Sequence, residues 1–311
     1  MNQSACPICG NSTGTSSVAR VLLNGTDEFG LDECRGCRIR YVTPMPDDRQ
    51  LAYFYSPQYY GSDWYRQLGN GMAFARGELS RLTPGLFLDV GCSLGYFIEG
   101  IRRHSRWNVA GVEWSQEAAK FARTQLGLDV RRGELVDCGF EACTVDYLHV
   151  DNVLEHVRDP VGFLKECRRL LRPGGTFCLS VPNGWVDSHS LVKFYRQEKR
   201  PGRSKDGHLF FFHRQALLGL LGQCGFALRK GCSFGIRRGL RALGLYPRWR
   251  RWQDAYEPYT PDISGMVEHP IRLAPARKRP DWYYRYRYRQ ARLKCLPGLR
   301  DFALDYRLHL Q

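Results

Sequence analysis

The sequence predicts an α/β fold with a doubly wound, mostly parallel β-sheet, and three features of residues 85–235 indicate it. Short apolar runs alternate with longer amphipathic patterns, as they do where helices join parallel strands. The apolar runs lack polar alternation, which is typical of strands buried on both faces. A loop rich in glycine follows the first run, at the sheet edge where such folds bind ligands.

The predicted elements follow one another along this region. Four runs are expected as strands: LFLDVG (86–91), VAGVEW (109–114), VDYLHV (145–150) and TFCLSVP (176–182). Three amphipathic stretches are expected as helices, at 115–127, 159–175 and 214–226, and each ends at or near glycine, a common stop signal. Crossovers between parallel strands are expected to be right-handed.

Composition divides the 311 residues into four regions. We predict a cysteine-bearing ribbon at 1–45, a helical lid or linker at 46–84, the α/β domain at 85–235 and a basic, aromatic extension at 236–311. The extension carries 17 Lys or Arg against 7 Asp or Glu, so it supplies +10 of the net charge of +15. The first residues show no signal-peptide pattern and no apolar run is long enough to span a membrane, so we expect a cytoplasmic protein.

The loop in LDVGCSLGYF (88–97) places an acid, Asp89, two residues before Gly91, with Gly95 four residues further on. A dinucleotide loop would read G-x-G-x-x-G and hold a pyrophosphate, which Asp89 would repel. An acid suits a ligand with an amino group, and S-adenosylmethionine has an ammonium, a carboxylate and no phosphate. Glu113 ends the second run, 22 residues past Gly91, where a carboxylate accepts hydrogen bonds from ribose hydroxyls.

From 87 to 226 the sequence resembles the class I S-adenosylmethionine-dependent methyltransferases, which have a Rossmann-like fold. The resemblance is carried by LDVGCSLGYF, GVEWS, RRGEL, VDNVLEHVRDP, LLRPGG and LSVPN, in the order of that family. It implies that Asp89, Gly91, Ser93 and Gly95 hold the amino-acid end of the cofactor and that Glu113 holds the ribose. Ser93 replaces a glycine of the usual loop. Glu134, in GEL, is expected near the adenine, and Asn152 in the cofactor site.

The stretch VDNVLEHV (150–157) follows the fourth strand, where these enzymes place the methyl group. The N-P-P-Y-like motif of base N-methylases is absent. His156 is therefore predicted as the general base and Glu155 as the group that orients its ring, because histidine titrates near neutral pH. An alternative is that both residues only cap the next helix or satisfy a buried loop.

This segment is also similar to that of the ubiquinone-biosynthesis O-methyltransferases, whose E-x-x-E-H motif binds a divalent metal. Asn152 stands where the first acid would be, so no catalytic metal is predicted. The Glu-His pair is shared with sugar C-methyltransferases that have a cysteine-bearing N-terminal domain. Their usual tyrosine is Val153 here, and C-methylation therefore ranks below O-methylation.

Two C-x-x-C pairs predict a metal site. Cys6 and Cys9 are separated from Cys34 and Cys37 by 24 residues, and four thiolates at this spacing form a closed tetrahedral zinc site of the ribbon type. A closed site has no open position for chemistry, so the zinc is expected to be structural. Cys92, in the glycine loop, is expected to be a small apolar residue rather than a nucleophile.

Three further regions have open roles. Tyr59, Tyr60 and Trp64 either cover the cofactor or form an ordinary aromatic cluster. Residues 183–213 form a basic insertion whose cationic run (193–205) either attracts an anionic group or is solvated. His208, in this insertion, could reach the site, but a structural histidine is favoured. RWRRW and DWYYRYRYRQ in the extension suit nucleic acid, an anionic membrane surface or a docked partner.

Together these features predict an enzyme that uses S-adenosylmethionine and a structural zinc to methylate an oxygen of a small polar acceptor, such as a sugar or nucleotide-sugar. RNA methylation, sugar C-methylation and a non-catalytic zinc adaptor are the alternatives.

Overall fold

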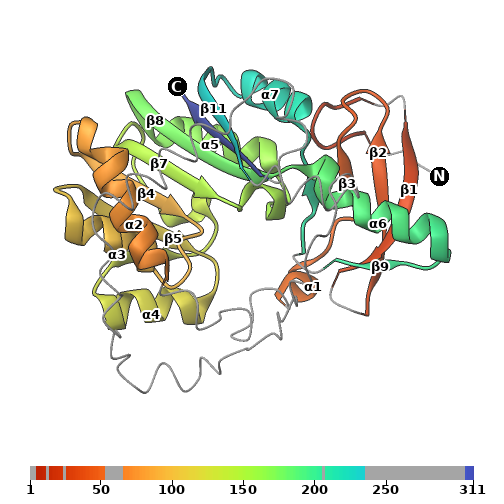
Figure 1. Cartoon of the computed structure of the whole chain (residues 1–311), viewed down its shortest axis with the longest axis horizontal. Helices are drawn as coiled ribbons and strands as arrows, with labels where there is room; N and C mark the ends of the chain where they lie inside the picture. Colours follow the sequence, from red (N-terminus) through yellow and green to blue (C-terminus); the bar gives the residue numbers. More distant parts are fainter. Residues whose placement is uncertain (1–4, 12–13, 24–25, 53–65, 205–206, 235–304) are drawn as a thin grey trace, which may run out of the picture.

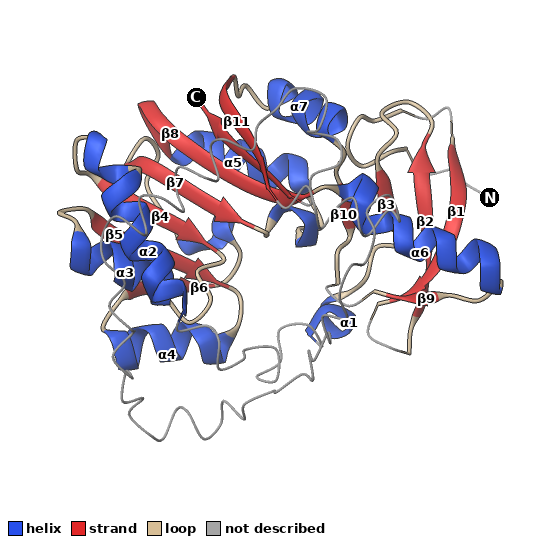
Figure 2. Cartoon of the chain, in the orientation of Figure 1, coloured by secondary structure: helices blue, strands red, loops and turns tan. Residues whose placement is uncertain are grey.

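The structure is a computed structural model that describes residues 5–11, 14–23, 26–52, 66–204, 207–234 and 305–311. Two β-sheets lie side by side, a seven-stranded sheet with helices around it and a five-stranded sheet near the N-terminus (Figures 1 and 2). Among these residues no helix has the length and apolar character needed to cross a membrane.

The larger sheet confirms the predicted α/β architecture. Its strand order is β11-β12-β8-β7-β4-β5-β6, and the five strands from β4 to β8 are parallel. The bounds are β4 Leu86–Val90, β5 Asn108–Glu113, β6 Asp129–Arg132, β7 Val145–Asp151, β8 Leu171–Pro182, β11 Leu228–Phe234 and β12 Asp305–Leu310. All four predicted strands are present.

Helices cover both faces of this sheet because alternate strand residues point to opposite sides. Phe87 and Tyr147 pack in one core with α2 (Arg66–Gly77), α3 (Tyr96–His104) and α4 (Gln116–Leu126). Leu88 and Leu148, the next residues along their strands, pack in a second core with α5 (Pro160–Leu170) and α7 (Arg214–Gln223). The predicted helix at 159–175 ends earlier than expected, because residues 171–182 form β8.

The C-terminal boundary predicted at 235 is wrong for the last strand. β12 pairs antiparallel with both β8 and β11, so residues 305–310 lie inside the sheet of the α/β domain. Leu308 and Leu310 are buried there. The rest of the predicted extension, with its arginine-aromatic stretches, lies outside the described residues.

The five-stranded sheet has the order β10-β3-β2-β1-β9. β1 (Thr15–Leu22), β2 (Glu28–Cys34) and β3 (Arg40–Thr43) come from the predicted ribbon, but β9 (Gly202–Arg203) and β10 (Phe210–Phe211) come from the insertion. The ribbon predicted at 1–45 is therefore completed by residues far along the chain. The insertion also contains a helix, α6 (Gly184–Glu198), which begins at Asn183 as N-cap and packs against β1.

One arginine joins β3 to α6. The Arg40 guanidinium donates to the buried carboxylate of Glu33 at 2.8 Å and to the Ser188 hydroxyl at 2.9 Å, and it lies 4.8 Å from the centre of the Trp185 ring. Because Glu33 is buried, replacing Arg40 by an uncharged residue would leave the Glu33 carboxylate without its partner and would destabilise the fold. Four short elements complete the description: α1 (Asp48–Ala52), η4 (Leu79–Arg81), η5 (Leu135–Cys138) and η6 (Leu154–His156).

Candidate active site

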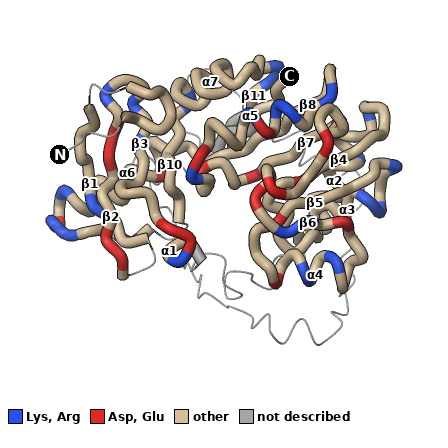
Figure 3. Tube along the Cα trace, turned by 180° about the vertical axis from the view of Figure 1, so that it is seen from behind, with Lys and Arg blue, Asp and Glu red and all other residues tan. Residues whose placement is uncertain are grey.

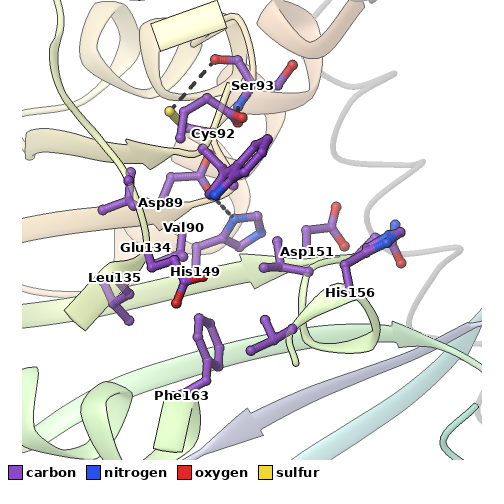
Figure 4. Close-up of a pocket in the computed structure, with 18 of the residues that line it drawn as sticks. Asp89, Val90, Cys92, Ser93, Glu134, Leu135, His149, Asp151, His156 and Phe163 are labelled. Atoms are coloured by element: carbon purple, nitrogen blue, oxygen red, sulfur yellow. Dashed lines mark hydrogen bonds and ion pairs between the residues drawn. The ribbon is translucent and has the colours of Figure 1, made fainter. Parts of the chain in front are cut away.

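A cavity of about 660 Å³ opens where the parallel strands β4, β5 and β7 end. Figure 4 shows Asp89 and His149 on one side of it and Asp151 and His156 further along the same edge. Seven residues predicted from the sequence line the cavity: Asp89, Gly91, Ser93, Glu113, Glu134, Asn152 and His156. The topology therefore brings most of the predicted site together, as expected for the carboxyl edge of a parallel sheet.

The loop between β4 and α3 needs its glycines. Gly91 has a φ of +77°, and a Cβ there would lie 2.4 Å from Cγ2 of Val153. Gly95, the N-cap of α3, has a φ of +80°, and a Cβ there would lie 2.7 Å from Leu128. Ser93 occupies the left-handed region at φ 53°. The buried Ser93 hydroxyl has no hydrogen-bond partner among the described residues, so it suits a polar group of a ligand.

The buried carboxylate of Asp89 is held by His149, a residue that the sequence analysis did not select. Their Oδ1 and Nδ1 atoms are 2.7 Å apart, and both side chains are buried (Figure 4). Burial raises the pKa of Asp89, while the charge and hydrogen bond of His149 lower it. A histidine in the otherwise apolar run VDYLHV was the available signal, since a buried polar side chain needs a partner.

Glu113 organises the backbone around it. One carboxylate oxygen accepts from the Ser93 amide and the other from the Ser115 amide, each at 2.8 Å. A carboxylate oxygen has two lone pairs, so each can accept a further hydrogen bond from a ligand hydroxyl. Glu113 therefore links the end of β5 to the glycine loop and still faces the cavity.

Among the charged residues that line the cavity, acids outnumber bases. Figure 3 marks the Asp and Glu positions along the chain trace in red, and red segments lie near β5 and β6 and at α1. Arg158 lies at the rim, forms an ion pair with Asp48 and has Glu134 at 3.7 Å. The Glu134 side chain is 56% exposed, and Glu134 is the residue directly before η5. Among the described residues that line the cavity, the acids are Asp48, Asp89, Glu113, Glu134, Asp151, Asp159 and Glu166, against Arg158 as the Arg or Lys. Such a wall favours a neutral or cationic ligand.

His156 lies in η6, directly after β7, and faces the cavity. Its ring hydrogen-bonds to the backbone of Gly207, in the insertion. Burial, followed by the nearby charge of His208, lowers the pKa of His156 to about 3. A ring that donates one N–H to a carbonyl keeps its second nitrogen as an acceptor, which is the form that a base requires.

Glu155 does not line the cavity and is 1% exposed. Neither of its carboxylate oxygens has a hydrogen-bond partner among the described residues. Among the described residues the His156 ring contacts the Gly207 backbone and makes no hydrogen bond to Glu155, so the orienting role predicted for Glu155 stays a prediction. Burial raises the pKa of Glu155 to about 8, against a smaller lowering by His208.

The four paired cysteines converge in the ribbon. Their sulfur atoms all lie within 4.8 Å of one another, with Cys6 to Cys37 at 3.8 Å and Cys9 to Cys34 at 3.7 Å. A tetrahedral zinc with Zn–S bonds of about 2.3 Å holds its sulfurs roughly 3.8 Å apart. The residues therefore fit a four-thiolate metal ion. Cys92 is buried beside the glycine loop and burial raises its pKa, which does not favour a reactive thiolate.

The aromatic residues Tyr59, Tyr60 and Trp64 lie outside the described residues, so their predicted covering role stays a prediction. Residues 193–204 of the cationic run are described, and most of them continue α6 and β9 rather than a loop.

A family model described as a methyltransferase domain matches residues 64–230, more than half of the chain. The chain belongs to this methyltransferase family. The matched region contains the glycine loop, His156 and all the residues that line the cavity except Asp48 and Leu51. Membership in the family implies S-adenosylmethionine as the cofactor.

Curated relatives match part of this methyltransferase domain. The ubiquinone biosynthesis O-methyltransferase of Parvibaculum lavamentivorans is 32% identical over 111 residues, covering 34% of this chain and 44% of the relative. A protein of the same description from Actinobacillus pleuropneumoniae serotype 5b is 30% identical over 128 residues, covering 37% and 54%. The chain spans between 30% and 54% of the length of the curated relatives it matches.

Two solved structures are similar in fold. The S-adenosylmethionine-dependent methyltransferase of Mesorhizobium loti has a TM-score of 0.43 at 16% identity, covering 78% of this chain and 98% of its own. That of Archaeoglobus fulgidus has a TM-score of 0.45 at 15% identity, covering 85% and 99%. Neither likeness bears on the reaction or the acceptor.

Proposed function

We propose that this chain is an S-adenosylmethionine-dependent methyltransferase that methylates an oxygen of a small polar acceptor, with His156 as the general base. The observation that carries the proposal is a single cavity that joins the glycine loop to His156. Its volume of about 660 Å³ lies in the range of sites that bind small molecules and cofactors. The loop supplies a place for the cofactor and the histidine supplies a place for the reacting proton.

The cofactor would lie along the ends of β4 and β5. Asp89, Gly91, Ser93 and Gly95 are proposed to hold its amino-acid end, because the loop offers a buried carboxylate, an unpartnered hydroxyl and a close backbone. Glu113 would accept the ribose hydroxyls.

Two residues would complete the cofactor site. Glu134 would lie near the adenine amine, at the exposed rim of the cavity. Asn152, which directly follows β7 and lines the cavity, would lie beside the transferred methyl group.

His156 would take the proton of the acceptor hydroxyl as its oxygen attacks the methyl carbon. The new bond joins that carbon to the acceptor oxygen, the sulfur–methyl bond breaks, and S-adenosylhomocysteine leaves as a neutral thioether. The proton that His156 receives is released later to water. A neutral histidine suits this role, and positioned general bases contribute roughly 100- to 10,000-fold.

The acidic wall favours an uncharged acceptor over a phosphorylated one. Beyond the acids assigned to the cofactor, Asp48, Asp151, Asp159 and Glu166 line the cavity. A nucleotide-sugar would bring its diphosphate toward these acids, whereas a free sugar would offer them hydroxyl groups as hydrogen-bond donors. We therefore place a neutral sugar or polyol ahead of a nucleotide-sugar. The cysteine ribbon, with structural zinc, would stabilise the fold and take no part in the methyl transfer.

The proposal is tested by incubating the purified chain with labelled S-adenosylmethionine and two pools, small metabolites and total RNA. Alkali-stable label in the metabolite pool, lost in the His156→Ala protein, is the expected result. Label in RNA would instead favour the nucleic-acid alternative. Label in neither pool, together with no heat of cofactor binding, would favour a non-catalytic adaptor.

A further inference from the structure

A segment of the insertion, Gly207–Leu209, lies against the turn that carries the proposed base. The Leu209 amide donates to the Glu155 carbonyl at 2.8 Å, and the backbone of Gly207 accepts from the His156 ring. The Leu209 carbonyl accepts in turn from the Val42 amide of β3 at 2.9 Å. The segment therefore links the ribbon sheet to the site, and His208 lies between its two contacts with η6.

His208 has a fixed orientation. Its Nδ1 is 2.7 Å from Oδ2 of Asp187, on α6, and the His208 side chain is about a tenth exposed. This contact directs the other ring nitrogen, Nε2, toward Glu155, whose Oε1 is 3.9 Å away. The His208 and His156 rings meet edge to face with their centres 4.9 Å apart.

Glu155 lies between these two histidines. Its carboxylate and one ring nitrogen from each histidine lie within 4.8 Å of one another. A buried carboxylate without hydrogen bonds is costly unless a nearby group compensates it. The histidines are positioned to do so, and the position of Glu155 therefore depends on His208 and on the carboxylate that holds it.

We propose that His208, held by Asp187, is a positioning residue that keeps the Glu155 carboxyl group beside His156 and keeps the His156 ring in one orientation and one tautomer. This inference rests on the proposed role of His156 as the base. In the reaction, the proton taken from the acceptor would place a positive charge on His156, and Glu155 lies where it can stabilise that charge. His208 does not itself line the cavity; it contacts His156, which does.

The charged groups around His156 determine whether its pKa rises or falls when His208 is replaced. Glu155 is the neighbouring residue in the chain. His208, in the insertion, faces the His156 ring and is paired with Asp187. Asp151, the last residue of β7, lines the cavity. The charge of His208 lowers the pKa of His156. Removing His208 therefore raises that pKa.

The test follows the histidine rings of the full-length protein by NMR with nitrogen-15 histidine, in the presence of S-adenosylhomocysteine. The wild type is expected to show His156 as one neutral tautomer from pH 5 to 8. In His208→Gln and in Asp187→Asn, the pKa of His156 should rise by about one pH unit or more, so that a protonated fraction of the ring appears near pH 5, together with mixing of the tautomers. His189→Ala, on the same helix as Asp187, is the control and should leave His156 unchanged.

A His156 titration in a folded His208→Gln protein that superimposes on the wild type would overturn the proposal. Should His208→Gln fail to fold, Asp187→Asn decides alone, because the Asp187 side chain is a quarter exposed and this change removes only its charge. The NMR titration needs no methyl acceptor. Failure of the proposed function would appear as unchanged turnover in His156→Ala, whereas failure of this inference would appear only in the ring titration.

Discussion

The His156 ring has two nitrogen atoms with different tasks in this site. One is committed to the Gly207 backbone, and the proposed mechanism needs the other for the acceptor proton. His156→Ala should therefore bind S-adenosylmethionine within about twofold of the wild type, while turnover falls by about 100-fold or more. Calorimetry and a methyl-transfer assay measure the two effects separately. Unchanged turnover would remove His156 from the mechanism.

Glu155 gives a prediction about stability and pH. Its pKa is raised from 4.5 to about 8 in the folded chain, so between these values the unfolded chain binds fewer protons than the folded one. The free energy of unfolding therefore falls as pH rises through this window, on account of Glu155. Glutamine cannot ionise, so Glu155→Gln should raise the thermal midpoint relative to wild type more at pH 8 than at pH 5.

Thermal scans at both pH values measure this difference, and Glu141→Gln, an exposed carboxyl group in the same domain, is the control. An equal effect of Glu155→Gln at the two pH values would mean that the buried carboxylate is already compensated across this range.

The site residues that could be predicted from the sequence are those whose role depends on a local pattern. Asp89, Gly91 and Glu113 are recognisable because their spacing follows from one strand, one turn and the next strand. His149 was not among the predicted site residues, and His208 was favoured as a structural histidine. Their partners, Asp89 and Glu155, lie 60 and 53 residues away in the chain, and no local pattern records such a contact.

The glycine loop is the element on which cofactor binding depends. Gly91→Ala places a methyl group 2.4 Å from Val153 in a backbone conformation that disfavours a side chain. We expect the variant to lose affinity for S-adenosylmethionine by about tenfold or more, because one of the two segments must move. Calorimetric titration measures the loss. Gly69→Ala, in α2 with open space around it, is the matched control and should bind normally.

The parallel strands and the helices between them were predictable because each is long enough to show its own pattern. The two-residue strands β9 and β10 were not, since only their pairing with β1 and β3 defines them. β12 was not predicted from the sequence for a related reason. Its place between β8 and β11 is set by partners more than 70 residues earlier in the chain.

At the scale of the whole molecule, the ribbon is tied to the methyltransferase domain by several contacts. β10 pairs with β3, and the His213 ring donates to the Cys37 carbonyl at 3.0 Å while its other nitrogen caps α7. Loss of the metal should therefore loosen more than the ribbon. Cys34→Ser is expected to reduce bound zinc from about one equivalent to a small fraction and to lower the thermal midpoint.

Metal analysis and thermal scans check this prediction, with Cys143→Ser, an exposed cysteine far from the ribbon sequence, as the control. A Cys34→Ser protein that kept both its zinc and its thermal midpoint would contradict the four-cysteine site.

Every proposed role in the site depends on S-adenosylmethionine lying in the cavity at the ends of β4, β5 and β7. Isothermal titration of the full chain with this compound, with NAD titrated in parallel, measures whether it binds. We expect one S-adenosylmethionine to bind per chain, more weakly in Gly91→Ala, and NAD not to bind. Binding of NAD, or no heat with S-adenosylmethionine, would contradict this expectation.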